Sequence, residues 1–321
     1  MRQRAKVDVI IPVYKPDDKF TRLVQRLQKQ TFRPNRIIVV NTERKYWDMA
    51  GPAEVAGLEV HHISKEEFDH GGTRNRAAGC SQAEIMIFMT DDAVPKDRYL
   101  VERLVEALSG KGPEGEVVAM AYARQLPGKG CKPVERYGRY FNYPENSQVK
   151  TKKDIPRLGI KAYFASNACC AYRKDIFEKQ GGFIGRTIFN EDMIYAANAM
   201  KAGYAIAYAA NAKVIHWHNF TLLQQFRRNF DLAASQASHP EIFAGLLSEG
   251  EGMRLVKDTA KWLVKQRLPY WLPYLVFSSG CKYAGYRMGK AYRFLPAWLV
   301  RWCSGNREYW TGGERVRENR R

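Results

Sequence analysis

The fold is decided by one short stretch, Glu84-Ile85-Met86-Ile87-Phe88-Met89-Thr90-Asp91-Asp92-Ala93-Val94-Pro95. Ile85–Met89 is too short for a helix and predicts one buried strand, which Pro95 helps to end. Asp91 and Asp92 therefore lie at the carboxyl end of a strand. Ligands bind at that edge of an open α/β sheet, and adjacent carboxylates there suit a hard divalent cation and a polyphosphate. The alternative is a solvated turn in which Asp92 or Asp97 caps the next helix.

The preceding residues supply the frame around this strand. Apolar runs over residues 7–13, 37–40 and 58–63 are accompanied by helical apolar spacing over residues 20–30. Strands that alternate with helices in this way predict an α/β fold, with a mostly parallel sheet and helices on both faces. No Gly-x-Gly-x-x-Gly motif and no glycine-rich phosphate loop follows the first strand. A dinucleotide-binding fold and a P-loop nucleotidase therefore lose their main support.

Polar and aromatic residues close the first two strands. Pro12 and Tyr14 end the first strand, where an aromatic edge can cover a nucleobase. Asn41 and Thr42 end the second strand, where short polar groups can form hydrogen bonds to a base or a ribose. Ordinary turn chemistry is the alternative for all four residues.

A second polar segment covers residues 69–75 and combines an acid, an imidazole, two glycines and a guanidinium just before an expected helix. The glycines permit close approach of the backbone, and Arg74 near a helix start favours an anion. The alternative is a helix N-terminus that Asp69 or Thr73 caps.

Motifs spread over nearly the whole chain share their order and spacing with one enzyme family. They are the acidic strand end and residues 9–14, 37–42, 67–75, 141–144, 164–167, 190–192, 216–218 and 282–289. In these motifs the chain resembles family 2 glycosyltransferases of the GT-A fold and, within that family, bacterial rhamnosyltransferases. The resemblance implies a Rossmann-like domain that transfers a sugar from a nucleotide sugar with inversion.

The resemblance also assigns roles to single residues. Asp192 is the expected base that takes the proton from the acceptor hydroxyl, and Glu191 orients it or binds the acceptor. Ser166 and Asn167 are expected to touch the donor phosphate or the acceptor sugar. Donor contacts are expected from Pro12, Tyr14, Asn41, Thr42, Asp69, His70, Arg74, Asn75, Asp91 and Asp92. For the two acids at 191 and 192, helix capping is the alternative.

The expected metal site departs from the family's usual Asp-x-Asp pattern. The matching triplet is Thr90-Asp91-Asp92, so Asp92 keeps the metal position and Thr90 replaces the first acid. An expected strand ending in His216 and His218 offers a second ligand. Residues two apart on a strand stand ~6.6 Å apart, which favours one imidazole over two. We expect His216 by the family's pattern, with His218 or a structural pair of imidazoles as alternatives; the cofactor is Mn²⁺ or Mg²⁺, and the donor set favours Mn²⁺.

Length and composition fit a catalytic domain with an appendage. Residues 1–220 fit one GT-A domain, and residues 221–321 form a basic, aromatic-rich helical region. Residues 128–161 are dense in Lys, Arg, Tyr and Pro and predict a flexible insertion or lid. The six cysteines show neither metal spacing nor a disulfide framework, and no signal peptide precedes Val7. A cytoplasmic location is therefore expected.

The formal charge of +19 is concentrated toward the end of the chain. Residues 254–321 contain 15 Lys or Arg and 4 Asp or Glu, and no stretch reaches the ~20 apolar residues needed to span a bilayer. A helical projection places on one face Lys282, Tyr286, Lys290 and Arg293, with Arg287 at its edge. This pattern predicts a surface that rests on anionic lipid at the inner face of the cell membrane. Packing within the protein or homo-oligomer formation is the alternative.

Three classes of function remain. An enzyme that moves a sugar, expected to be L-rhamnose from dTDP-L-rhamnose, onto a lipid-linked or growing surface polysaccharide explains both the acidic site and the basic tail. The same fold with a UDP-hexose or galactofuranose donor, or an inactive assembly scaffold that fits the Thr90 departure, is the alternative. A nucleic-acid-binding protein explains the charge but needs no strand-end acids, and the sequence carries no recognised binding motif.

Overall fold

The computed structural model describes residues 5–50, 55–246 and 249–311. The chain divides into two compact units. The first unit contains Met1–Gly128, Asn142–Arg186 and Glu191–Trp217. The second contains Lys129–Phe141, Thr187–Asn190 and His218–Arg321. The two units are described in turn.

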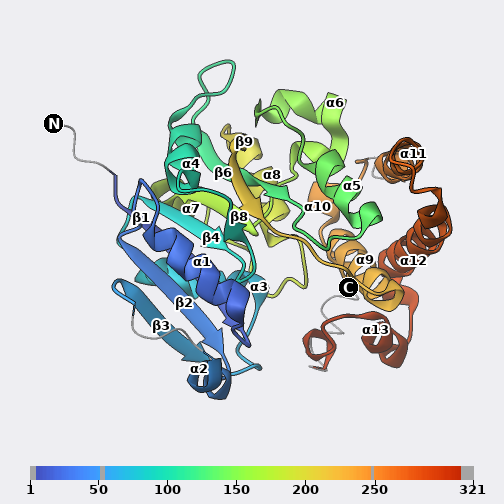
Figure 1. Ribbon diagram of the computed structural model, residues 1–321, viewed down its shortest axis with the longest axis horizontal. Coiled ribbons are helices and arrows are strands. Elements are labelled where there is room, and N and C mark those ends of the chain that lie inside the picture. The colour runs from blue at the N-terminus through green and yellow to red at the C-terminus, as the bar shows by residue number, and fades with distance from the viewer. Residues whose placement is uncertain (1–4, 51–54, 247–248, 312–321) are drawn as a thin grey trace. The chain divides into compact units, whose positions relative to one another are not determined.

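The framework of the first unit is a sheet that has nine strands in the described residues (Figure 1). Its first half has the order β3-β2-β1-β4, and every neighbouring pair in it is parallel. These strands are β1 (Val7–Tyr14), β2 (Arg36–Thr42), β3 (Leu58–Ile63) and β4 (Ile85–Met89). All five residues of β4 are buried, as its sequence predicts.

The second half of the sheet is mixed. Strand β8 is antiparallel to β4 and β6, while β9 is parallel to β6 and antiparallel to β5 and β7. The strands are β5 (Val94–Pro95), β6 (Val118–Leu126), β7 (Gln148–Lys150), β8 (Cys169–Arg173) and β9 (Ala205–Ile215). The residues that precede β8 and the residues that follow β9 therefore lie at the same edge as the end of β4.

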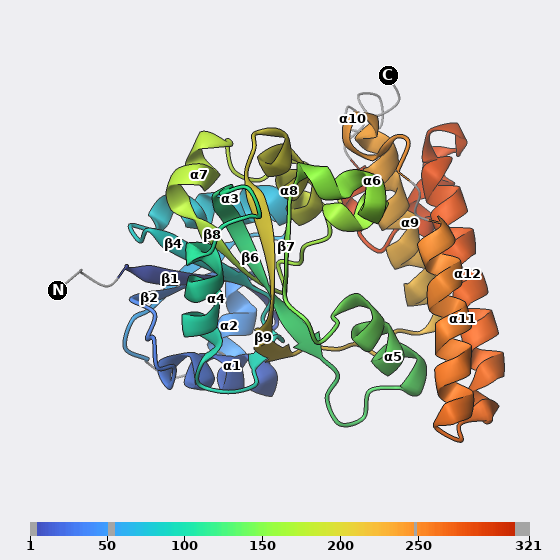
Figure 2. The same cartoon turned by 90° about the horizontal axis from the view of Figure 1, so that it is seen from above.

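Helices cover both faces of this sheet, which confirms the predicted α/β class (Figure 2). One face carries α1 (Asp18–Gln28) and α4 (Leu100–Ser109), whose buried residues belong to the same core cluster as alternate residues of β1 such as Val9 and Ile11. The other face carries a cluster of edge-on and tilted aromatic rings, Phe88, Tyr172, Phe177, Phe183 and Tyr195. The remaining helices are α2 (Arg44–Ala50), α3 (His70–Cys80), α6 (Ile155–Leu158), α7 (Lys174–Lys179) and α8 (Glu191–Lys201), with 3₁₀ turns η1 (Lys152–Asp154) and η2 (Gly159–Ala162).

The second unit is helical. Its main elements are α5 (Pro133–Asn142), α9 (Leu222–Ser238), α11 (Glu249–Lys265) and α12 (Leu272–Lys290). Shorter ones are α10 (Pro240–Phe243), α13 (Ala297–Cys303) and the 3₁₀ turns η3 (Pro269–Trp271), η4 (Tyr292–Phe294) and η5 (Glu308–Trp310). Helices α11 and α12 lie side by side (Figure 2). A C-terminal helical region is therefore confirmed, and none of the described helices is long and apolar enough to cross a membrane.

The basic face predicted for residues 282–293 is exposed only in part. Lys282 is partly buried, with its ammonium group 3.5 Å from a carboxylate oxygen of Glu135, and Tyr286 contacts Gln236. Arg287, Lys290 and Arg293 are exposed. The projection groups side chains by angle alone, and the packing of α12 on its neighbours decides which of them reach solvent.

The predicted insertion over residues 128–161 contains regular structure. It includes α5, β7 and the short helical turns between residues 152 and 161. Its closure as a lid stays a prediction.

Candidate active site

The end of β4 is tied to the end of β1 by the first of the two adjacent acids. The backbone N–H of Tyr14 donates to Oδ2 of Asp91 at 3.4 Å. Burial and the neighbouring charge of Asp92 raise the pKa of Asp91 to about 6. Asp91 therefore braces two strand ends, while Asp92 has a different set of neighbours.

Asp92 faces an imidazole whose tautomer is set by a glutamine. Oδ1 of Asp92 lies 3.2 Å from Nε2 of His216. On the other side of the ring, Nδ1 of His216 lies 2.8 Å from Oε1 of Gln125, and Nε2 of Gln125 donates to Oγ of Ser166 at 2.8 Å. Because an amide oxygen only accepts, the imidazole proton belongs on Nδ1, and in the neutral ring Nε2 keeps its lone pair beside the carboxylate. This arrangement fits a metal ligand oriented by a neighbour that does not touch the metal.

The two histidines lie beyond the strand rather than on it. Strand β9 ends at Ile215, so the strand spacing assumed from the sequence does not apply to His216 and His218, and that expectation was wrong. His218 is the first residue of the second unit, and its ring stacks on Phe220 with the ring centroids 4.8 Å apart. Among the described residues, those that could hold a metal ion as a group are Asp92, His216 and His218.

A second pair of acids opens α8. Oδ2 of Asp192 accepts from the backbone N–H of Asn167 at 3.0 Å, and Oδ1 accepts from the N–H of Met193 at 2.8 Å. Burial and the charge of Glu191 raise the pKa of Asp192 to about 7. A carboxylate with this pKa is well matched to proton transfer near neutral pH.

Glu191 has the opposite electrostatic environment. Its carboxylate lies 3.4 Å from the guanidinium of Arg74 and accepts from Nδ2 of Asn167 at 3.2 Å, and both charged side chains are buried. Burial by itself raises the pKa of Glu191, but the charges of Arg74 and His70 and the hydrogen bond from Asn167 lower it overall. The pair is therefore divided into an ionised acid at 191 and an acid at 192 that titrates near neutral pH, which is how enzymes give two carboxylates different roles.

One peptide joins these two clusters. Ser166 belongs to the chain of hydrogen bonds that orients His216, and the next residue, Asn167, contacts both Glu191 and Asp192. The amide of Asn167 is held in turn by the hydroxyl of Tyr172, which donates to its Oδ1 at 2.7 Å. The predicted residues Asp92, His216, Ser166, Asn167, Arg74, Glu191 and Asp192 thus form one connected network.

Two members of this network were missed by sequence reasoning, Gln125 and Tyr172. Gln125 is buried near the end of the apolar strand β6, and Tyr172 is fully buried in β8. The available signal was a polar side chain near the end of each apolar run, next to Arg124 in β6 and next to Arg173 in β8. That signal is weak, because a buried tyrosine or glutamine also occurs in ordinary cores.

The segment over residues 69–75 forms the first turns of α3, which begins at His70 and so includes residues expected to precede the helix. Asp69 is the N-cap: its Oδ2 accepts from the N–H of Gly72 at 2.6 Å and from that of Arg186 at 3.1 Å. The ring of His70 lies edge-on to Phe68, with centroids 5.2 Å apart. Asp69 therefore fulfils the capping alternative, and its contact with a donor stays a prediction.

The same helix is pressed against the loop before α8. A Cβ atom at Gly71 would lie 2.0 Å from the carbonyl oxygen of Ile184, so only glycine allows this approach. Next to it, the side-chain amide of Asn75 donates to the carbonyl of Phe183 at 2.7 Å and accepts from its N–H at 2.9 Å. Asn75 thus braces this loop, and its predicted contact with the donor is untested.

The ends of β1 and β2 carry the residues predicted to hold the nucleotide. Tyr14 is exposed and meets Tyr46 edge-on at 5.4 Å, with the ammonium group of Lys15 within 5.2 Å of both ring centroids. Pro12 is partly buried. Asn41 and Thr42 are buried, and Oδ1 of Asn41 and Oγ1 of Thr42 find no hydrogen-bond partner in the described part of the chain. The end of β1 thus carries exposed aromatic and basic side chains, and the end of β2 carries two buried polar atoms without a hydrogen-bond partner in the described part of the chain.

Comparisons with known proteins identify the family. A family model for glycosyl transferase family 2 matches residues 8–181. Two relatives are each 36% identical to this chain. The O-antigen chain rhamnosyltransferase RfbN of Salmonella typhimurium matches over 95% of this chain and 96% of its own length. The O-antigen chain rhamnosyltransferase WbaN of Salmonella anatum matches over 94% of this chain and 95% of its own length.

A solved structure extends the likeness to the fold. The mannosyltransferase PcManGT of Pyrobaculum calidifontis, in complex with GDP-Man and Mn²⁺, has a TM-score of 0.53, covering 99% of this chain and 88% of that one at 15% identity. The predicted GT-A fold is confirmed by this likeness and by the family match. The network that joins the acids at 92, 191 and 192 stands on a sheet of this fold, and the chain belongs to glycosyl transferase family 2.

Proposed function

We propose that this glycosyltransferase moves L-rhamnose from dTDP-L-rhamnose onto a lipid-linked or growing surface polysaccharide, with inversion at the sugar carbon. The observation that carries the proposal is the connected network at one sheet edge, with His216 oriented beside Asp92 and a base of raised pKa at Asp192. The sugar follows from two relatives that are 36% identical along almost their full length and are named as O-antigen chain rhamnosyltransferases.

In the proposed reaction, Asp192 takes the proton of the acceptor hydroxyl as that oxygen attacks the donor sugar. Hydrogen bonds from two backbone N–H groups hold its carboxylate, and ionised Glu191 beside it keeps its pKa high enough for the task. Glu191 itself is fixed by Arg74 and Asn167, which leaves it to orient the base or an acceptor hydroxyl.

Asp92 and His216 would hold a divalent cation, Mn²⁺ or Mg²⁺, and His218 is proposed as a further ligand. Bound there, the cation would supply positive charge for the departing diphosphate. Gln125 would keep Nε2 of His216 available, and Tyr14 and Lys15 would cover the nucleotide base and phosphate.

We also propose that the second unit contacts an anionic membrane surface on the cytoplasmic side, where a lipid-linked acceptor would lie. Exposed aromatic side chains, among them Phe277, Phe294 and Trp298, accompany the exposed Arg287 and Lys290. Aromatic rings with cations are the combination that binds an interface without spanning it. Co-sedimentation with anionic and neutral vesicles tests this, and equal binding to both would favour packing or a homo-oligomer.

A donor screen tests the main proposal. The full chain is mixed with dTDP-L-rhamnose, UDP-hexoses, UDP-galactofuranose and GDP-mannose, each with Mn²⁺ or Mg²⁺, while hydrolysis and thermal stabilisation are measured. We expect dTDP-L-rhamnose to give both signals, and a chelator to remove them. A different preferred donor would overturn the rhamnose assignment, and no response to any donor would support an inactive scaffold.

A further inference from the structure

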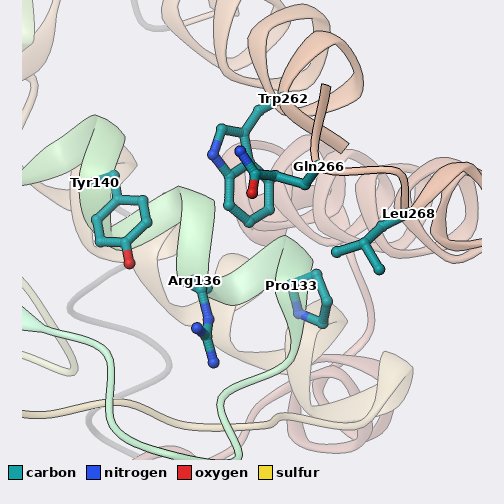
Figure 3. Close-up of a pocket in the computed structure, with 6 residues that line it drawn as sticks. All are labelled: Pro133, Arg136, Tyr140, Trp262, Gln266 and Leu268. Carbon is teal, nitrogen blue, oxygen red and sulfur yellow. The ribbon is translucent and has the colours of Figure 1, made fainter. Parts of the chain in front are cut away.

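A cavity of about 480 Å³ lies within the second unit, between α5 and α11. Figure 3 shows the six side chains that line it, Pro133, Arg136, Tyr140, Trp262, Gln266 and Leu268. All six belong to the second unit, whereas the acids at 92, 191 and 192 belong to the first. Its volume lies within the roughly 300–1,000 Å³ that is typical of small-molecule sites.

Helical spacing explains why these residues share one cavity. Pro133, Arg136 and Tyr140 follow one another at intervals of three and four along α5, so they lie on one face. Trp262 and Gln266 are four residues apart at the end of α11, where the N–H of Gln266 still donates to the carbonyl of Trp262 at 2.9 Å. The walls are therefore one face of α5, the end of α11, and the turn after α11 that contains Gln266 and Leu268.

A hydrophobic cluster holds the helices that form the cavity together. Val134 on α5, Leu263 on α11 and Leu275 on α12 are buried together in one hydrophobic cluster. Trp262 itself packs on Tyr137, with ring centroids 5.5 Å apart and planes tilted by 37°, and lies near Tyr140 at 6.3 Å. These contacts hold the indole in place, so the cavity is formed before any ligand arrives.

The lining has the chemistry of a carbohydrate site. Aromatic rings at Trp262 and Tyr140 offer flat apolar faces, on which the C–H groups of a sugar ring can lie. The guanidinium of Arg136, the hydroxyl of Tyr140 and the amide of Gln266 offer hydrogen-bonding groups around them. The six lining residues include no carboxylate, and a single cation is too little for a diphosphate. Arg136 also donates to the carbonyl oxygen of Cys131 at 3.4 Å, but an acyl chain would offer no hydrogen bond to the hydroxyl of Tyr140 or the amide of Gln266.

We propose that this cavity binds a sugar residue of the acceptor polysaccharide other than the one that is glycosylated. The inference rests on the proposed function, since it takes the acceptor to be a polysaccharide chain. Such a subsite would give the enzyme affinity for a growing chain over a short acceptor, without touching the reacting groups.

The test uses the full chain, a ladder of rhamnose-containing O-antigen oligosaccharides from one to four repeat units, and the variants Trp262→Ala and Gln266→Ala. Val264→Ala is the matched control, because Val264 is exposed on α11, the helix that carries Trp262, and does not line the cavity. Gln266 is exposed, so Gln266→Ala should leave the core intact. This variant still tests the cavity if Trp262→Ala fails to fold. The readouts are KM and kcat for each acceptor length, hydrolysis of dTDP-L-rhamnose without acceptor, and oligosaccharide binding without donor by NMR.

We expect Trp262→Ala to raise KM for the long acceptors by about three- to tenfold, with kcat, the shortest acceptor and donor hydrolysis unchanged. Gln266→Ala should give a smaller rise in the same direction, and Val264→Ala none. Oligosaccharide affinity that is unchanged in both cavity variants would overturn the subsite, as would equal losses at every acceptor length. Failure of wild-type protein to use dTDP-L-rhamnose would instead count against the proposed donor, because oligosaccharide binding is measured without it.

Discussion

The two units treat polar and apolar side chains in opposite ways. The first buries charged groups at the sheet edge, where Arg74 is 5% exposed and Glu191 is 7% exposed. The second exposes large aromatic groups, with Phe294 90% and Trp298 64% exposed. Buried charges are costly unless paired, and exposed aromatic surface is unusual unless something covers it. From this difference we propose that the first unit performs the chemistry and that the second recognises the acceptor and its surroundings.

The largest effect should come from the base in the first unit. Asp192→Asn removes the proposed base and should lower transfer by about 10²–10⁴-fold while donor binding is kept. The variant should fold, because asparagine resembles the protonated acid. Initial rates with dTDP-L-rhamnose and donor-induced thermal stabilisation measure the two effects. Asn198→Ala, on the exposed side of the same helix, is the control, and transfer within a few-fold of wild type would remove Asp192 from this role.

The orientation of His216 is the next test of the first unit. Gln125→Leu removes the acceptor of the Nδ1 proton without touching Asp92, and it should weaken Mn²⁺ binding by about 10–100-fold. His216→Ala should weaken binding at least as much. Titration of the protein with Mn²⁺, followed by electron paramagnetic resonance, measures the affinity directly. Activity that survives exhaustive chelation would contradict the metal site and leave cationic side chains to hold the diphosphate.

The raised pKa of Asp192 predicts a particular pH profile. The base works when ionised, so kcat/KM should rise about tenfold per pH unit below pH 7 and level off above about 7. An otherwise similar profile with a midpoint near 4 would show that the site leaves this acid at its ordinary pKa.

The raised pKa of Asp192 also predicts that the contribution of this acid to the stability of the protein falls as the pH rises. The native acid holds its proton up to about pH 7, whereas the unfolded acid loses it near 3.9, so its contribution to stability is lost as pH rises through about 7. Asp192→Asn has no charge to bury. Its melting temperature relative to wild type should therefore increase between pH 5 and 8, and a constant difference would contradict the linkage.

The sequence predicted the parts of the site that depend on local order. Strand β4 was expected at its observed bounds, and the acids at 92, 191 and 192 were placed at the ends of a strand and the start of a helix. Gln125 and Tyr172 act through partners 91 and 5 residues away. The role of Gln125 depends on the parallel pairing of β6 with β9, and that of Tyr172 on the antiparallel pairing of β8 with β4; no local pattern specifies either pairing. The exposed face of α12 was unpredictable for the same reason, since its packing partners lie on other helices.

The smallest predicted effects concern the stability of the second unit, at the contact between α12 and α9. A Cβ atom added to Gly285 would lie 2.2 Å from the carbonyl oxygen of Phe226. A Cβ atom added to Gly289 would lie 2.3 Å from the carbonyl oxygen of Phe230. At Gly280, on the same helix, the Cβ atom would meet nothing within 4 Å. The first two glycines are thus required by close packing, whereas the third only weakens the helix.

Gly285→Ala and Gly289→Ala should therefore each lower the free energy of unfolding by about 1–3 kcal/mol, because the two helices must separate to admit a methyl group. Gly280→Ala should raise it by up to about 1 kcal/mol, because alanine favours the helix. Chemical denaturation of the full chain measures all three, with donor hydrolysis recorded alongside. If the first unit performs the chemistry alone, donor hydrolysis should survive in every folded variant. Loss of hydrolysis in folded Gly289→Ala would mean that the second unit takes part in catalysis, and the division between the two units would fail.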